Sequence, residues 1–309
     1  MLVLYNYSIV AQDRQSILQK FEEKMKYKEK ISPYIIKMYQ NLYDDNFLIE
    51  TKSKNKTENF LECSKQIWLD KDTGAIVGAR FCKQRLCPIC NYRRSTMLWH
   101  KVKEVTNHID NEYIFITLTV KNCPAENLKK EIDHILESFH RITTRRTWKK
   151  NFIGYIRGLE ITYNAKENTY HPHLHILAVA CEDYFKSEYV DIHTLRQWWT
   201  ESAQLDYYVQ VNIKKVKDKD SAIAEVVKYA VKVADLLENE IDENRLKATQ
   251  TIASCINGRR LMSTGGIITK LSKKLKIDLE AEEEEMNDIK NAYYYEFING
   301  KYEYKNLQT

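Results

Sequence analysis

The chain has 309 residues, of which 43% are hydrophobic, and this is ordinary for a folded protein with one large domain or a core and a small module. Its 48 basic and 43 acidic side chains give a formal net charge of +5, so charge is informative only where it is clustered. No apolar run reaches the roughly 18 residues of a membrane span and the first residues lack the features of a secretory signal, which predicts a cytoplasmic protein with no membrane partner.

The first 60 residues are expected to form a helical region. Residues 14–48 show the apolar spacing of a helix among many charges, whereas residues 51–59 are polar and have the composition of a loop. A group of cysteines and a helix predicted over residues 93–108 would together form a module at 61–110. The sequence holds no internal repeat and no Gly-x-x-x-x-Gly-Lys-Ser/Thr loop, so it lacks the phosphate cradle of an ATP-driven helicase.

Four of the seven cysteines predict a structural zinc site in this module. Cys87 and Cys90 form a Cys-x-x-Cys turn, which brings two thiolates to one tetrahedral ion, and Cys63 and Cys82 can complete the set of four ligands. Disulfide pairing is the alternative, which a reducing cytoplasm disfavours. Cys63 is the less secure ligand because it lies far upstream of Cys82, and His100 is the substitute for it.

The middle of the chain, residues 111–240, alternates strands and helices in the order βαββαβα. The strands are expected at 112–120, 152–163, 170–181 and 207–216, and the helices at 125–147, 190–204 and 221–237. This order folds most simply as an antiparallel sheet with helices on one side, an α+β fold of the ferredoxin-like class. Residues 241–309 would form a C-terminal extension, in which 292–297 could add a short strand.

The strand at 170–181 carries alternate histidines. His171, His173 and His175 are two residues apart, and because successive side chains of a strand face opposite ways, the three imidazoles share one face. Such a row can build a metal site on a sheet. The alternative is an exposed strand that is rich in histidine by chance.

The helix at 221–237 places three chemically active side chains together. Its apolar positions form one stripe, and Glu225, Tyr229 and Lys232 lie outside that stripe at three- and four-residue spacing. A carboxylate, a phenol and an ammonium group at this spacing can all reach one phosphate. The alternative is an ordinary polar helix surface.

Three motifs in this order resemble the HUH endonuclease family, and within it the rolling-circle replication initiators of small bacterial plasmids. They are the strand Phe115–Thr119, the sequence His-Pro-His-Leu-His at 171–175, and the Tyr-x-x-Lys pair of Tyr229 and Lys232 with Glu225 before it. No tyrosine lies four residues from Tyr229 on either side, so the resemblance is to single-tyrosine enzymes. It implies the HUH fold, which agrees with the predicted order of elements.

The resemblance implies a catalytic divalent metal ion, Mg²⁺ or Mn²⁺. An odd pairing register between the two neighbouring strands would put Glu160 on the same face as His173 and His175, and two imidazoles with one carboxylate can bind such an ion. Members of the family commonly take a third ligand from this neighbouring strand, which favours Glu160 over His171. The alternative role for Glu160 is a structural ion pair with Arg157.

The resemblance also implies the reaction. Tyr229 would attack a DNA phosphodiester, helped by positive charge from Lys232, and leave a 5′-phosphotyrosyl link and a free 3′-hydroxyl that primes a polymerase. Because no second tyrosine lies one turn away, Glu225 would act as general base for the water that releases the new end. This predicts termination without re-initiation.

The implied partners are the double-strand origin of a plasmid and its single-stranded DNA, with a host helicase and polymerase, and a homodimer is an assembly that the family allows. Basic side chains suited to a DNA backbone cluster in two places, with a solvated helix surface as the alternative. They are Arg141, Arg145, Arg146, Lys149 and Lys150, with Trp148 among them, and Lys214 and Lys215. These clusters and the zinc module would bind the duplex beside the nick.

Two other functions stay open from the sequence. The resemblance covers about residues 60–270, and a transposase or mobilisation protein of the same family would share those motifs. A zinc-containing DNA-binding repressor without catalysis is the other, although the intact histidines and Glu160 argue against a decayed site. A test for metal-dependent cleavage separates the nucleases from the repressor.

Overall fold

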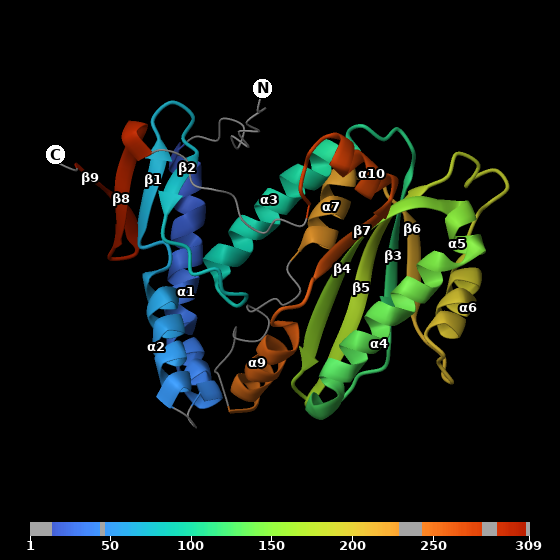
Figure 1. Cartoon of the computed structure of the whole chain (residues 1–309), viewed down its shortest axis with the longest axis horizontal. Helices are drawn as coiled ribbons and strands as arrows, with labels where there is room; N and C mark the ends of the chain where they lie inside the picture. Colours follow the sequence, from blue (N-terminus) through green and yellow to red (C-terminus); the bar gives the residue numbers. More distant parts are fainter. Residues whose placement is uncertain (1–13, 44–46, 229–242, 280–288, 307–309) are drawn as a thin grey trace. The chain divides into compact units, whose positions relative to one another are not determined.

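The computed structural model describes residues 14–43, 47–228, 243–279 and 289–306 (Figure 1). The chain divides into two compact units, one made of residues 1–97 and 283–309 and the other of residues 98–282. Each unit has its own antiparallel sheet. Among the helices in the described ranges, none combines the length and the apolar character that crossing a membrane requires.

The first unit joins the two ends of the chain through one sheet. Its strands have the order β2-β1-β8-β9, so β1 from the early part of the chain pairs with β8 from the late part. The elements are α1 (Arg14–Tyr43), α2 (Phe47–Glu62), β1 (Gln66–Asp70), β2 (Ile76–Ala79), β8 (Ala292–Ile298) and β9 (Lys301–Lys305). The late strand agrees with the expectation for 292–297, but the loop expected at 51–59 is wrong, because these residues are helical in α2.

The second unit contains the predicted βαββαβα order, which the structure confirms as an α+β fold. The sheet has the strand order β6-β3-β5-β4-β7, with antiparallel pairing throughout. Its strands are β3 (Tyr113–Thr119), β4 (Phe152–Asn164), β5 (Thr169–Ala180), β6 (Val211–Lys215) and β7 (Met262–Gly266). Its helices are α4 (Ala125–Thr144), α5 (Arg146–Asn151), α6 (Ile192–Ser202), α7 (Lys219–Val227), α9 (Glu243–Ile256) and α10 (Ile267–Lys274), and α3 (Pro88–Thr106) leads into it.

Helices pack on both faces of this sheet, so the expectation of helices on one side is wrong. On one face, Val226 of α7 belongs to the same buried cluster as Phe115 and Leu177 of the strands. On the other face, the ring of Phe139 on α4 lies 5.0 Å from that of Tyr155 on β4. Figure 1 shows α4 and α7 on opposite sides of the sheet. A sheet covered on both faces needs strands that are apolar on both faces.

The two halves of β5 differ in burial, and this positions the histidines. From Leu177 to Ala180 every residue is buried, as a doubly covered strand requires. From His171 to His175 burial alternates, with the histidines half-buried and Pro172 and Leu174 buried. One face of the sheet is therefore left partly open at the histidine end of β5.

Helix α7 ends at Val227 and lies close against β4. The expected helix ran to residue 237, but α7 is capped by Lys228, and residues 229–242 lie outside the described part of the chain. The close approach depends on Gly158, because a Cβ atom there would lie 2.2 Å from the carbonyl oxygen of Val226. A larger residue at this place in β4 would push the end of α7 away from the sheet.

Candidate functional site

The pairing of β4 with β5 brings a carboxylate to the histidines. Glu160 lies directly opposite His173, and Gly158 lies opposite His175, so these positions share one face of the sheet. On the other side of β5, Thr117 of β3 lies opposite His175. The register is odd, meaning that here even-numbered residues of β4 lie opposite odd-numbered residues of β5. This is the register we expected from the sequence, and it places the Glu160 side chain among the imidazoles.

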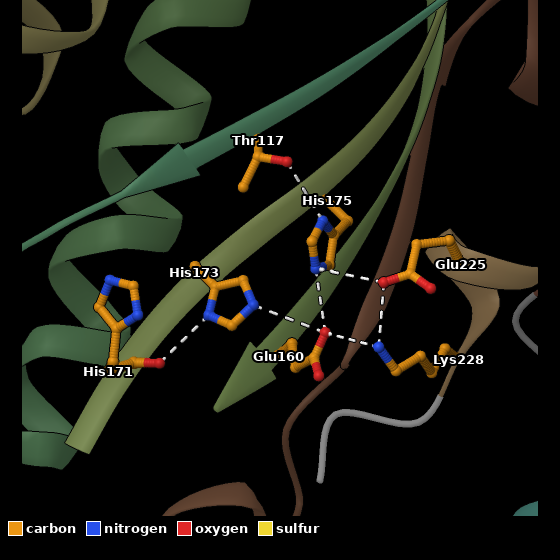
Figure 2. A network of polar contacts seen from close by, with 7 residues as sticks. All are labelled: Thr117, Glu160, His171, His173, His175, Glu225 and Lys228. Carbon is orange, nitrogen blue, oxygen red and sulfur yellow. Dashed lines mark hydrogen bonds and ion pairs between the residues drawn. The ribbon is translucent and has the colours of Figure 1, made fainter. Parts of the chain in front are cut away.

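Both imidazoles point their Nε2 atoms at one oxygen of Glu160 (Figure 2). The distance to Oε2 of Glu160 is 2.9 Å from His175 and 3.5 Å from His173, and the three donor atoms lie within 4.8 Å of one another. Donors around an octahedral ion with bonds of about 2.1 Å lie about 3 Å apart. Two imidazoles and one carboxylate with this spacing fit a divalent cation, with positions left for water or phosphate oxygens.

The other ring nitrogens of the two histidines are held by oxygen acceptors. The Nδ1 atom of His175 lies 3.4 Å from the hydroxyl of Thr117, and Nδ1 of His173 lies 3.2 Å from the carbonyl oxygen of His171 (Figure 2). If a metal ion took the place of the Nε2–H hydrogen bonds to Glu160, an Nδ1–H that donates to these oxygens would leave the Nε2 lone pair to bind it. His171 thus supports His173 through its backbone, while its own ring stacks on that of His173.

Lys228 is a member of the site that the sequence had not indicated. Its Nζ lies 3.2 Å from Oε2 of Glu160 and 2.9 Å from Oε1 of Glu225, and the same Glu225 oxygen lies 3.8 Å from Nε2 of His175 (Figure 2). The pair of Lys228 with Glu225 could have been predicted from their three-residue spacing on a helix. The contact of Lys228 with Glu160 could not have been predicted, because it depends on where α7 ends.

The charges of this network are set by the contacts within it. Burial acts to raise the pKa of Glu160, but the hydrogen bonds from His173 and His175 and the charge of Lys228 outweigh it and hold that pKa well below its usual range. Burial acts to lower the pKa of Lys228, and its contacts with Glu225 and Glu160 raise it by more. The site therefore holds an ionised carboxylate and a charged ammonium group side by side.

The ion pair between Glu160 and Arg157, offered as an example of a structural role, does not form. Arg157 is three positions from Glu160 on the same strand, so the two side chains point to opposite faces of the sheet. The Arg157 guanidinium instead donates to the carbonyl oxygen of Leu261, at 3.3 Å. Glu160 is 6% exposed, and its partners are the two histidines and Lys228.

Tyr229 and Lys232 lie outside the described residues. Tyr229 is the next residue in the sequence after Lys228, the last one described in this segment. Of the three groups expected on the helix, the structure places Glu225, whose side chain is 43% exposed beside His175. The roles of Tyr229 and Lys232 stay predictions.

In the first unit, the four clustered cysteines come together as one group of sulfur atoms. The Sγ atoms of Cys63, Cys82, Cys87 and Cys90 lie within 4.8 Å of one another, and three of the pairs are 3.6 Å apart. Tetrahedral zinc with Zn–S bonds of about 2.3 Å holds its sulfurs about 3.8 Å apart, whereas a disulfide bond is about 2.05 Å long. The group thus fits a tetrahedral ion, and it includes Cys63 without His100.

A buried lysine lies against this cysteine group. Lys28 of α1 is 2% exposed, and its Nζ donates to the carbonyl oxygens of Cys63 and Leu61 at 2.7 and 2.9 Å. Burial lowers the pKa of Lys28, and negative charge on the cysteines opposes this effect. A buried ammonium group beside several thiols matches a site where thiolates bind a metal ion.

Most side chains of the first basic cluster already have partners within the protein. Arg141, Arg145 and Lys150 form ion pairs with Glu137, Glu201 and Glu188 at 2.6 to 3.0 Å, and Trp148 is 2% exposed within an aromatic group. Arg146 and Lys149 are exposed. DNA contact by this cluster stays a prediction, but Trp148 is a core residue and does not offer its ring to a base.

The second basic cluster lies on β6, at the edge of the sheet and next to the site. Lys214 lies opposite Phe115 on the face that also carries His175, and Lys215 pairs with Glu112 at 2.7 Å. Both lysines are exposed. The charge of Lys214 is therefore on the same face as the candidate metal-binding group, which consists of Glu160, His173 and His175, and DNA binding by Lys214 and Lys215 stays a prediction.

Comparison with known proteins identifies the family. The model of a replication protein family matches residues 73–305. A Rep protein of Bacillus amyloliquefaciens is 30% identical over 272 residues, which cover 77% of this chain and 80% of the relative, and one of a Bacillus species is 31% identical over 76% and 85%. A third, from Streptococcus pneumoniae serotype 2, is 34% identical over 64% of each chain. No solved structure matches. These matches confirm the resemblance to Rep initiators that the motifs indicated, and the chain belongs to the replication protein family.

Proposed function

We propose that this protein starts rolling-circle replication of a plasmid by nicking one strand of the origin with Tyr229. The observation that carries the proposal is the convergence of the two histidine Nε2 atoms and the Lys228 ammonium on one oxygen of Glu160. With a divalent cation bound, this arrangement would place positive charge and open coordination positions at one point, which suits a DNA phosphate. Membership of the replication protein family supports a role at an origin.

Mg²⁺ or Mn²⁺ held by Glu160, His173 and His175 would supply positive charge to a non-bridging oxygen of the scissile phosphate. Lys228 adds a fixed cation next to that position, held by Glu160 and Glu225. Thr117 and the carbonyl oxygen of His171 keep the imidazoles oriented. The chain thus binds and orients the phosphate with groups that are in place before DNA arrives.

In the nicking step, the phenolic oxygen of Tyr229 forms a bond to phosphorus while the bond from phosphorus to the 3′-oxygen breaks. The phenol proton is transferred to the leaving 3′-oxygen, so the products are a 5′-phosphotyrosyl link and a free 3′-hydroxyl. Lys232 and Lys228 favour loss of the phenol proton by adding positive charge. The position of Tyr229 immediately after Lys228, which contacts Glu160, supports this role.

In the terminating step, Glu225 accepts a proton from a water molecule that attacks the phosphotyrosyl phosphorus. The bond between phosphorus and the Tyr229 oxygen breaks, the tyrosine regains a proton, and the DNA end leaves with a 5′-phosphate. Glu225 suits this role because its carboxylate is partly exposed to water and lies 3.8 Å from His175. A carboxylate in place of a second tyrosine makes the release hydrolytic.

The cysteine group would hold a structural Zn²⁺ ion, and the module around it would bind the duplex beside the nick. The sulfur spacing and the buried Lys28 support the ion. A host helicase and a host polymerase would open and extend the DNA. A homodimer is compatible with the proposal but is not required by it.

The test uses the full chain, Mn²⁺ and a labelled single-stranded origin oligonucleotide. Tyr229→Phe should abolish the covalent protein–DNA adduct, and Glu225→Gln should form the adduct but release it slowly. Lys130→Ala, a change on the exposed surface of α4, is the control and should behave as the parent does. An adduct that persists in Tyr229→Phe would refute the assignment of the nucleophile. If neither the parent protein nor any variant cleaves the oligonucleotide, the result would favour a non-catalytic DNA-binding repressor.

A further inference from the structure

A groove runs from the proposed nicking site along the edge of the sheet. It lies between β6 and α7, has a volume of about 620 Å³, and has His175 and Glu225 among its lining residues. The apolar part of its lining is Phe115, Val216 and Ala222. Cavities of this size typically take one small molecule or a group of similar size.

The sheet register leads directly from the site into the groove. Asn212 of β6 lies opposite Thr117 of β3, which in turn lies opposite His175 of β5, so the three form one row across the sheet. One row further along, Lys214 lies opposite Phe115. A strand of DNA with one phosphate at His175 would therefore have its next nucleotide over Asn212 and Lys214.

The lining of this groove carries more positive than negative side chains, with Lys214, Lys215 and Lys217 against Asp218 and Glu225. The carboxylate of Asp218 caps the start of α7 and accepts from Ser221 and the Asp220 backbone, and Glu225 is paired with Lys228. Lys215 is likewise paired, with Glu112. Among the residues that the structure describes, Lys214 and Lys217 line the groove without a carboxylate partner, and both are exposed.

We propose that this groove binds the single-stranded nucleotide that flanks the cut, an inference that rests on the proposed nicking function. Lys214 and Lys217 bind the flanking phosphates, the partly exposed apolar side chains of Val216 and Ala222 contact the base, and Asn212 binds the base edge. Single-stranded nucleic acid is bound in this way, with cations along the backbone and apolar surfaces against the bases. Phosphate contacts set the position of the strand, and the amide contact sets the preferred base.

The binding test uses the full chain carrying Tyr229→Phe, so that binding is measured without cleavage. Fluorescence anisotropy with a single-stranded origin oligonucleotide is recorded at several salt concentrations. Lys214→Ala and Lys217→Ala should each weaken binding and reduce the slope of log affinity against log salt by about 0.7, the value for one contact to a single strand. The matched control is Lys130→Ala, which removes the same charge from the exposed surface of α4.

The base contact is tested with oligonucleotides that differ at one position near the cut. The parent should prefer one base at a flanking position by about fivefold or more, and Asn212→Ala should remove that preference. The proposal is overturned if Lys214→Ala and Lys217→Ala bind like the control, and the base contact is overturned if Asn212→Ala weakens all oligonucleotides equally. Nicking is tested separately, by covalent adduct formation with the protein that keeps Tyr229. If the adduct forms but the lysine variants bind DNA like the control, only the groove proposal is refuted. If no adduct forms, the nicking function is refuted, and weaker DNA binding by the lysine variants would still support the groove as a single-strand binding site.

Discussion

Gly158 of β4 and Val226 of α7 approach so closely that a Cβ atom on the glycine would lie 2.2 Å from the valine carbonyl oxygen. On α7, Val226 follows Glu225 directly and lies two residues before Lys228. On β4, Gly158 lies two residues before Glu160. The end of α7 is therefore held against the part of the sheet that carries the candidate metal-binding group. The missing side chain of Gly158 is what allows Lys228 to reach Glu160 at 3.2 Å.

Gly158→Ala should displace the end of α7 and break the contact between Lys228 and Glu160. The added methyl group meets backbone, which cannot rotate away, so the unfolding free energy should fall by about 1–3 kcal/mol. Mn²⁺ affinity should also change, because a partner of Glu160 is lost. Urea unfolding and calorimetric titration with Mn²⁺ measure the two effects.

Gly154→Ala is the matched control for this change. It adds a methyl group on the same strand and face, where the new Cβ would lie 2.8 Å from the side chain of Ile267 on α10. It should lower stability without altering Mn²⁺ binding, since α10 does not contribute to the site. Equal effects of the two changes on Mn²⁺ affinity would show that α7 is not positioned by Gly158.

Glu160→Gln should weaken Mn²⁺ binding at least about tenfold, since it removes the only carboxylate of the metal-binding group that the structure describes. His171→Ala is the control, because the backbone carbonyl that accepts from His173 survives the change while the ring is lost. Calorimetric titration of the folded protein distinguishes them. An affinity that falls more for His171→Ala than for Glu160→Gln would contradict the proposed ligand set.

Lys228→Met should bind Mn²⁺ severalfold more tightly and nick more slowly. The methionine keeps the length of the side chain but removes an ammonium group that shares Oε2 of Glu160 with the histidines and repels a second cation there. The loss of the same charge leaves less stabilisation for the phosphate during cleavage. If Lys228 had a purely structural role, Lys228→Met would lower both the Mn²⁺ affinity and the nicking rate. Lys228→Arg, which keeps the charge, should nick at close to the parent rate.

The convergence of Glu160, His173 and His175 could be predicted from sequence because it depends on local rules. Alternation places His173 and His175 on one face, and an odd register with a neighbouring strand brings Glu160 to them. The group of four cysteines followed from the Cys-x-x-Cys turn in the same way. The order of elements βαββαβα was predictable because strand-like and helix-like spacings of apolar residues alternate along the chain.

The remaining features depend on contacts between distant segments. Strand β7 is short and glycine-rich, so its pairing with β4 left no periodic signal. The pairing of β1 with β8 joins segments from opposite ends of the sequence. Lys228 was missed because the expected helix continued past it, whereas α7 ends at Val227, one residue after its close contact with Gly158 of β4.

The cysteine group allows a test of zinc binding through a lysine that is not itself a ligand. Zinc with four thiolates has a net negative charge, and the buried Lys28 ammonium lies against the backbone of Cys63, where it offsets that charge. Lys28→Met should therefore release zinc to a chelator faster and leave the carbonyl oxygens of Cys63 and Leu61 without their donor. Lys37→Met, an exposed position on the same helix, should release zinc at the parent rate. Zinc content by mass spectrometry and release monitored with a coloured chelator measure both variants, and equal release rates would show that Lys28 serves packing alone.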